Sequence, residues 1–260
     1  MILSPPRQTY RQTYVLRLLA VLFFGLGAAM LGLVGYREHQ PWALASAAAL
    51  ALLLVASWVI AAKIILTIHD EGIRRTSAFG VKEIEWRNVK EYRYQAVPQR
   101  GGGGLIGAAV IAAKKAKYGA AAVTNLYVTI ISNDGTKIAI NSFYKDAYEC
   151  IGTILSAVHA QLRPAVDRQV RATGAMFGPL RLTARDVQYK SKTPIPLTEI
   201  TRAEIRGTQL QIKRKNKMLA AVACRSQKVP NVLLMLDVME TLGAGAGELP
   251  MIDPLGHGRF

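Results

Sequence analysis

Residues 42–73 read WALASAAALALLLVASWVIAAKIILTIHDEGI, and they join an uncharged apolar segment to a strand pattern without a linker. The apolar part, residues 42–62, has 21 residues, which at 1.5 Å per residue matches the roughly 30 Å hydrocarbon core of a bilayer. Ile64 to Ile68 then predict a strand that ends in a turn at Asp70 to Gly72. This stretch therefore predicts a membrane helix that leads directly into a β-sheet.

A second uncharged segment, residues 18–36, lies just before the first and predicts another transmembrane helix. The connection between them, residues 37–41, is too short for anything but an antiparallel hairpin. A cleaved signal peptide is the alternative, because Arg7, Arg11 and Arg17 form a positively charged leader. The apolar segment, however, is longer than the usual core of a signal peptide, and a second span follows at once.

The flanking charges predict the orientation of this hairpin. The charges of the connection, Arg37 and Glu38, cancel, whereas both outer flanks are basic. By the positive-inside rule both ends then lie in the cytoplasm, so we expect a multi-pass protein of the inner (cytoplasmic) membrane with cytoplasmic termini. The basic flanking residues are Arg7, Arg11 and Arg17 before the hairpin, and Lys63, Arg74 and Arg75 after it.

Small residues follow one face of each span and predict that the two helices pack on each other, with docking of a partner subunit as the alternative. They are Gly25, Ala28, Ala29 and Gly32 in the first span, and Ala43, Ala47 and Ala51 in the second.

The composition agrees with a chain that is partly in the membrane. Hydrophobic residues make up 51% of the 260 residues although there are 33 Lys and Arg and 17 Asp and Glu. Outside residues 1–62, 29 basic and 16 acidic residues remain, with ordinary strand and helix patterns. These features exclude a disordered chain, a disulfide scaffold and a polytopic transporter. Cys150 and Cys224 indicate a reducing compartment and fit buried positions.

The rest of the chain repeats one order of elements, which predicts two small α+β domains at residues 63–162 and 175–243. We expect a connector at residues 163–174 and a flexible tail at 244–260. The strands expected in the first domain are residues 64–68, a strand from Ile73, and residues 84–86, 89–94, 126–131 and 137–140, followed by a helix from about Asp146. Those expected in the second are residues 182–187, 195–200, 210–212 and 219–224, followed by a helix from Pro230 with Val232, Met235, Leu236 and Met239 on one face.

The first domain resembles the bacterial pleckstrin-homology-like domains found beside N-terminal membrane hairpins. The resemblance rests on Leu66-Thr67, on Glu71-Gly72-Ile73 and on residues 84–89, IEWRNV. It implies a strongly bent, barrel-like antiparallel sheet closed by a C-terminal helix, and it implies little about function. The second domain resembles the family more weakly, since Leu197 replaces Trp86 and Arg185-Asp186 replace the Glu-Gly turn.

Residues 101–123 form a Gly- and Ala-rich insertion that the second domain lacks. A phosphate-binding loop is excluded, because Gly107 is followed by Ala108 instead of Lys and Ser or Thr. The insertion fits either a hinge with a small helix packed on the domain, or a segment that dips into the membrane while lysines contact anionic headgroups. Those lysines are Lys114, Lys115 and Lys117.

A basic run, KRKNK at residues 213–217, lies in a predicted hairpin turn. Residues 173–243 carry 12 basic and 5 acidic side chains, so this run is either a solvated turn or a surface that docks on anionic lipid or on a protein partner. The candidate binding residues are Lys213, Arg214, Lys215 and Lys217.

Catalysis has no motif in the sequence. The histidines, His39, His69, His159 and His257, are scattered, and His159 is expected at the surface or its boundary. We therefore predict no catalytic residue, cofactor, metal or nucleic-acid partner. We expect a membrane-anchored cytoplasmic binding or scaffolding protein, an accessory subunit or assembly factor that contacts other subunits of a membrane complex. The alternative is a peripheral sensor of anionic lipid, and a membrane-bound enzyme ranks third.

Overall fold

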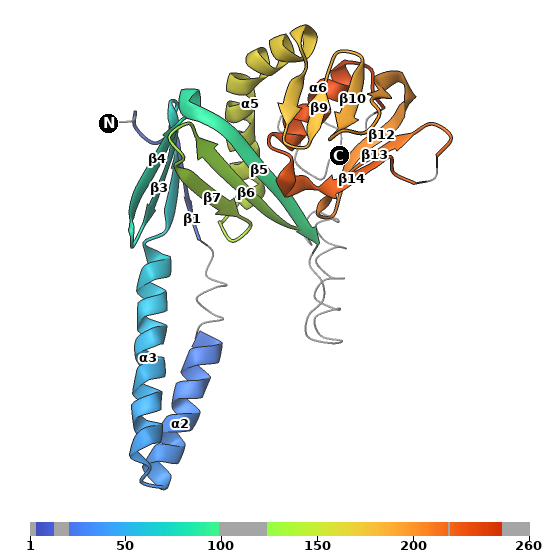
Figure 1. Ribbon diagram of the computed structural model, residues 1–260. Coiled ribbons are helices and arrows are strands. Elements are labelled where there is room, and N and C mark those ends of the chain that lie inside the picture. The colour runs from blue at the N-terminus through green and yellow to red at the C-terminus, as the bar shows by residue number, and fades with distance from the viewer. Residues whose placement is uncertain (1–3, 13–20, 99–123, 218, 246–260) are drawn as a thin grey trace. The chain divides into compact units, whose positions relative to one another are not determined.

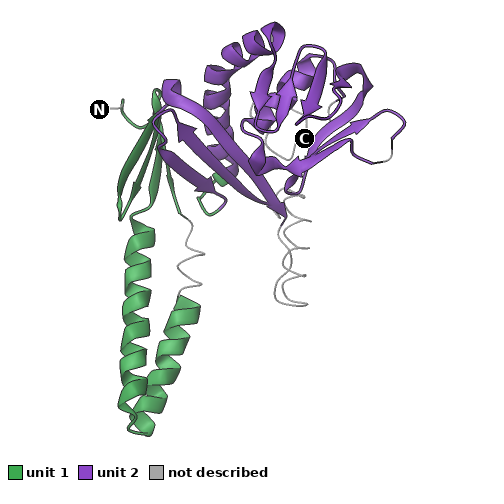
Figure 2. Ribbon diagram, in the orientation of Figure 1, with its two compact units in different colours: residues 1–84, 143–147 green, residues 85–142, 148–260 purple. Residues whose placement is uncertain are grey.

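The computed structural model describes residues 4–12, 21–98, 124–217 and 219–245. The predicted α+β class is confirmed: the described strands form four antiparallel sheets, with helices between and after them (Figure 1). The expected barrels are not seen, because each of these four sheets is open. The chain divides into two compact units, Met1–Ile84 with Phe143–Ala147, and Glu85–Ser142 with Tyr148–Phe260 (Figure 2).

The first unit contains a four-stranded sheet whose outer strand precedes the apolar hairpin in sequence. Arg11 of this strand lies opposite Ile65, and Gln8 lies opposite Ile68. Tyr10 is buried between exposed neighbours, as in a half-buried strand. The sheet has the order β1 (Gln8–Arg11), β2 (Ile65–Ile68), β3 (Gly72–Ser77) and β4 (Gly80–Glu85).

The hairpin of the first unit is helical, as predicted. One π-helical turn, η1 (Val21–Gly25), leads into α2 (Leu26–Arg37), and α3 (Pro41–Ala62) returns. Among the described helices, α3 is long and apolar enough to cross a membrane, whereas Val21–Arg37 is a shorter apolar helix. Residues 18–20 of the predicted first span lie outside the described part of the chain.

The two helices pack against each other in antiparallel fashion through small residues. A Cβ atom on Gly35 would lie 2.8 Å from the Leu44 side chain, and one on Gly32 would lie 3.8 Å from Cβ of Ala47. Ala43 is buried, but Ala29 and Ala51 are exposed, so the predicted small face is correct only in part.

The second unit begins with a three-stranded sheet and a long helix. The predicted helix from Asp146 is present, but it continues to Ala172 and so includes most of the expected connector. Pro164 lies inside it at an exposed position, and Ala160, whose carbonyl loses its helical donor, is exposed to water as well. The elements are η2 (Trp86–Asn88), β5 (Val89–Pro98), β6 (Thr124–Ser132), β7 (Lys137–Asn141) and α5 (Ala147–Ala172).

The same order of elements follows in the rest of this unit. Leu197 begins the 3₁₀ turn η4 as Trp86 begins η2, and both side chains are buried. The elements are β8 (Ala175–Phe177), β9 (Leu180–Leu182), β10 (Asp186–Tyr189), β11 (Ile195–Pro196), η4 (Leu197–Glu199), β12 (Ile200–Arg206), β13 (Gln209–Arg214), β14 (Val222–Arg225), η5 (Ser226–Lys228) and α6 (Val232–Thr241).

Helix α6 is buried on nearly all sides, although the sequence predicted one apolar face. Leu233, Leu234 and Val238 are buried in addition to the four predicted residues. A helix that is apolar all round is typical of the interior of a larger body. Helix α6 is therefore a central element of the second unit, not the cover of one small domain.

Two predicted boundaries in this region are wrong. The return strand β14 begins at Val222 instead of Leu219, and the Leu219 side chain is 84% exposed. At the C-terminal end, Ala244 is buried, and Gly245 exchanges backbone hydrogen bonds with Ile200 and Ala203 of β12. The start of the predicted tail is thus packed along a strand edge, while residues 246–260 lie outside the described chain.

Candidate functional site

The largest exposed apolar surface lies on the hairpin. Since the small residues face each other, the large side chains of α2 and α3 point away from the helix pair. Monomeric soluble proteins rarely expose such a continuous surface, which is typical of contact with lipid or protein. The exposed large side chains are Val21, Leu22, Phe23, Leu26, Met30, Leu33, Val34, Tyr36, Trp42, Leu44, Leu52, Leu53, Val55, Trp58 and Val59.

The base of the hairpin is held by the sheet of the first unit. The chain leaves β1 at Arg11 and re-enters β2 at Ile65, and these two residues lie opposite each other. Next to this pair, Gln12 forms a β-bridge with Tyr144, and the Lys145 N–H donates to the Arg11 carbonyl at 2.9 Å. The two ends of the hairpin are therefore joined to adjacent strands at one end of one sheet.

The four candidate residues of the basic run in the second unit differ in exposure and in their partners. Arg214 forms an ion pair with Glu199, and Lys213 is half-buried on β13. Lys215 and Lys217 are exposed, close in sequence to exposed Leu219. Lys215 and Lys217 are thus the most exposed of the four candidates. The other three candidates, Lys114, Lys115 and Lys117, fall within residues 99–123, outside the described part of the chain.

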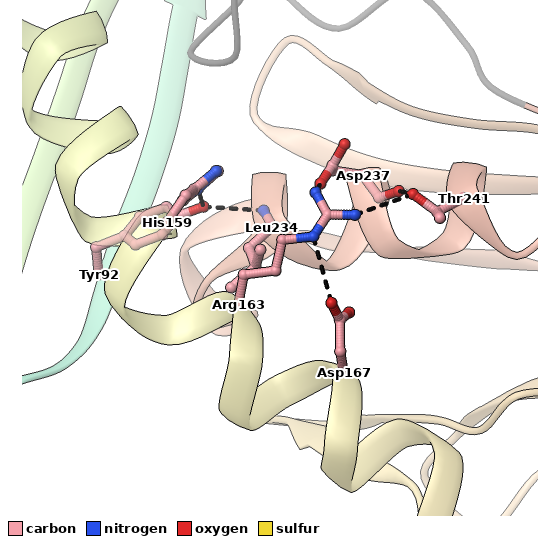
Figure 3. A network of polar contacts seen from close by, with 7 residues as sticks. All are labelled: Tyr92, His159, Arg163, Asp167, Leu234, Asp237 and Thr241. Carbon is pink, nitrogen blue, oxygen red and sulfur yellow. Dashed lines mark hydrogen bonds and ion pairs between the residues drawn. The ribbon is translucent and has the colours of Figure 1, made fainter.

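A buried polar network in the second unit joins β5, α5 and α6 (Figure 3). Contrary to prediction, His159 is only 1% exposed, and its Nε2 lies 2.7 Å from the Tyr92 hydroxyl. The Leu234 N–H donates to the same hydroxyl oxygen at 3.0 Å, so Tyr92 satisfies one of the unpaired donors in the first turn of α6. The hydroxyl and Nε2 share one hydrogen bond, and the imidazole tautomer decides which of the two groups donates.

Burial keeps both members of this pair uncharged. Desolvation, helped by the positive charge of Arg163, lowers the pKa of His159 to about 4, and desolvation raises the pKa of Tyr92. At neutral pH the pair therefore acts as a structural hydrogen bond in the core.

Arg163 forms a second part of the network, one helical turn after His159 on α5. Its guanidinium contacts the Asp237 carboxylate on α6, lies 3.4 Å from Asp167 and donates to the Thr241 hydroxyl at 3.1 Å (Figure 3). Planar guanidinium groups are suited to such multiple contacts. This cluster joins α5 to the C-terminal half of α6.

The segment before α6 covers the free edge of β5. Asn231, in a left-handed conformation, accepts from the Tyr92 N–H at 2.8 Å through its side chain and donates its own N–H to the Tyr92 carbonyl at 2.9 Å. The Ser226 hydroxyl donates to the Tyr94 carbonyl at 2.9 Å, and Arg93 donates to the Gln227 carbonyl at 3.0 Å. The elements from β5 to α6 are therefore parts of one packed unit.

The remaining chemically reactive groups are part of the core. Cys150 and Cys224 are buried, as predicted, and desolvation raises the pKa of the Cys150 thiol to about 12. A thiol with so high a pKa is a poor nucleophile at neutral pH. Among the described residues, no three His, Cys, Asp or Glu side chains gather where they could hold a metal ion.

One signal for the buried histidine was present in the sequence. His159 follows Leu155 by four residues, and Arg163 follows His159 by four, so all three share a helix face with the predicted core residues. The partner residues could not be found this way, since Tyr92 and Leu234 are far from His159 in sequence.

Comparison with known proteins finds one family. No curated protein matches the chain. A model of a family of unknown function, DUF6585, matches residues 109–246, which is more than half of the 260 residues. The match covers β6 to α6 and ends one residue after Gly245, so it includes the α5–α6 network and the packed start of the tail. The chain therefore belongs to the DUF6585 family of unknown function.

Proposed function

We propose that this protein is a membrane-anchored binding or scaffolding protein whose helical hairpin crosses the cytoplasmic membrane twice and holds the β-rich units at the cytoplasmic face. The observation that carries the proposal is the pairing of β1 with β2 across an apolar hairpin. Helix α3, at 22 residues, is long enough to span the bilayer. Since β1 pairs with the strand that directly follows α3, both ends of the hairpin lie on the same side, and η1 with α2 supports a second crossing.

The pleckstrin-homology-like resemblance is part of this proposal. Its support is the order of antiparallel strands followed by a helix, which occurs before α5 and again before α6. Domains of this architecture serve many binding functions, so the likeness supports a binding role in general and names no ligand.

The burial of the reactive side chains favours a binding role over catalysis. His159, Tyr92 and both cysteines are buried in the core. The segment between residues 173 and 243 is instead basic, with 12 basic against 5 acidic residues. A basic surface at the cytoplasmic face suits acidic partner subunits and anionic headgroups.

The anchor is tested by replacing the hairpin with a short turn. If residues 13–63 are exchanged for Asn-Gly, Gln12 and Ile64 are joined by a two-residue β-turn that preserves the register of β1 and β2. We expect this variant to be folded by circular dichroism and to appear in the soluble fraction, whereas the full chain stays in membranes after carbonate extraction. A matched control that removes residues 4–63 also deletes β1, exposes the edge of β2, and should be less stable.

If the variant with Asn-Gly in place of residues 13–63 remains in carbonate-washed membranes, the proposed anchor is wrong. The orientation has its own readout: a cysteine in place of His39, between α2 and α3, should react with a membrane-impermeant thiol reagent added outside intact cells. A cysteine in place of Asp70, in the turn between β2 and β3, should not.

Sensing of anionic lipid is a second candidate function, favoured by exposed Leu219 near Lys215 and Lys217. We expect an environment-sensitive dye at Leu219→Cys to shift to the blue in nanodiscs with acidic lipid at low salt. The shift should fade with added salt, because exposed charges are screened over about 10 Å at 0.1 M. Lys215→Gln with Lys217→Gln should abolish it, whereas Lys190→Gln with Lys192→Gln removes the same charge elsewhere and should not. Equal spectra in neutral and acidic lipid would refute lipid sensing.

A further inference from the structure

The turn between β3 and β4 exposes large apolar side chains outside the helical hairpin. Phe79 is 86% exposed and Val81 is 56% exposed, although they belong to a sheet whose other large apolar residues are mostly buried. An exposed aromatic residue at the tip of a tight turn contributes nothing to the core of its own unit. It does provide a rigid apolar contact for another phase or molecule.

The register of the sheet places this turn level with the end of α3. Thr76 lies opposite Ile65, and Arg75 lies opposite Leu66. Beyond this last pair, β3 ends at Ser77 and the two turn residues Ala78 and Phe79 follow, while the chain before Ile65 leads within three residues to Ala62, the last residue of α3. The tip of the turn therefore lies at the end of the sheet from which the hairpin emerges, and at the level where α3 ends.

The charges of the first unit are distributed in the same direction. Near this end of the sheet the exposed side chains Arg11, Lys63 and Lys82 are basic. At the opposite end, exposed Asp70 and Glu71 outnumber the one basic residue Arg7, whose guanidinium lies 3.6 Å from the Asp70 carboxylate. A basic and aromatic end beside the emerging helices, with an acidic end away from them, is the arrangement expected of a surface that rests on anionic headgroups.

We propose that the β3–β4 turn inserts Phe79 into the interface of the bilayer that the hairpin crosses, with Val81 beside it and Arg11, Lys63 and Lys82 at the headgroups. The inference rests on the proposed membrane anchor. It adds a third point of attachment to the membrane, next to the two ends of the hairpin. Three points of contact define a plane, so the turn holds the sheet of the first unit in one orientation to the membrane surface. A protein partner on the same turn is the competing outcome, but the level of Phe79 with the end of α3 favours lipid.

The test uses the full chain in nanodiscs that contain acidic lipid, with one dye-labelled cysteine per variant. Phe79→Cys and Ala78→Cys report on the turn, and Asp70→Cys, at the opposite end of the same sheet, is the matched control. Val55→Cys, exposed in the middle of α3, reports on the anchor. The native cysteines are buried, so the unsubstituted chain serves as the blank for labelling. Quenching by brominated lipid tails is measured for each variant.

We expect quenching at residues 79 and 78 to exceed that at residue 70 by at least about threefold, with the strongest quenching at residue 55. Ala78→Cys keeps Phe79, so it tests the insertion even if the dye disturbs position 79 itself. If residue 55 is quenched while residues 78 and 79 match residue 70, the inference is wrong and the anchor stands. If residue 55 is not quenched either, the membrane anchor itself fails.

Discussion

Gly178→Ala is expected to lower the free energy of unfolding of the second unit by about 3 kcal/mol or more, because two separate costs add at this position. Gly178 lies in the turn between β8 and β9 with φ of +61°, a conformation that an alanine adopts only with strain. A Cβ atom there would also lie 2.4 Å from the Lys228 carbonyl oxygen and 3.0 Å from Cδ of Pro230. The segment contacted leads into α6, so relief of this clash would displace the N-terminus of the central helix.

Gly135→Ala is the matched control. Gly135 also has a positive φ, +85°, but a Cβ atom there would have no neighbour within 4 Å. It should therefore show the conformational cost alone, about 1 kcal/mol. The measurement is denaturant unfolding of the full chain in mild detergent, followed by circular dichroism. Equal losses for the two variants would show that the turn of Gly178 does not approach residues 228–230 as closely as the structure indicates.

The second unit is expected to lose about 3 kcal/mol of stability between pH 7 and pH 4 through His159 alone. The pKa of His159 falls from its ordinary 6.5 to about 4 in the folded state, mainly because the ring is desolvated and also because Arg163 is near. Between these two values the unfolded chain binds the proton and the folded chain does not. The contribution of His159 to the free energy of unfolding is therefore fully present above pH 6.5 and declines as the pH falls toward 4. Below pH 4, protonation of His159 causes no further decline.

His159→Gln tests the assignment, because glutamine keeps an acceptor for the Tyr92 hydroxyl and has no proton to gain in this range. Its stability at pH 7 should be lower than that of the parent, but its decline toward pH 4 should be shallower by most of the 3 kcal/mol. His39→Gln, at an exposed position between α2 and α3, should leave the decline unchanged. Parallel pH profiles for the parent and His159→Gln would mean that the buried imidazole is not the group that titrates.

Local patterns in the sequence were sufficient where neighbouring residues decide the structure. The uncharged run at residues 42–62 predicted α3, and alternation around Val89 to Tyr94 predicted β5. The correspondence of Trp86 and Leu197 was also visible, but both were assigned to strands, whereas each begins a 3₁₀ turn. Burial of Cys150 followed from its place on the apolar face of α5. In each case the periodicity of one element contains the information.

Only the tertiary structure decided the features that depend on distant parts of the chain. β1 is a strand because β2, more than 50 residues later, supplies its hydrogen-bond partners. Helix α6 is buried on nearly all sides because β5 and α5 cover the face that a single small domain would leave in water, and His159 is buried for the same reason. The level of Phe79 with the end of α3 follows from the register of β2 and β3, which a strand pattern alone does not contain. A sequence shows which face of an element is apolar, whereas the neighbour that covers it depends on the packing of the whole unit.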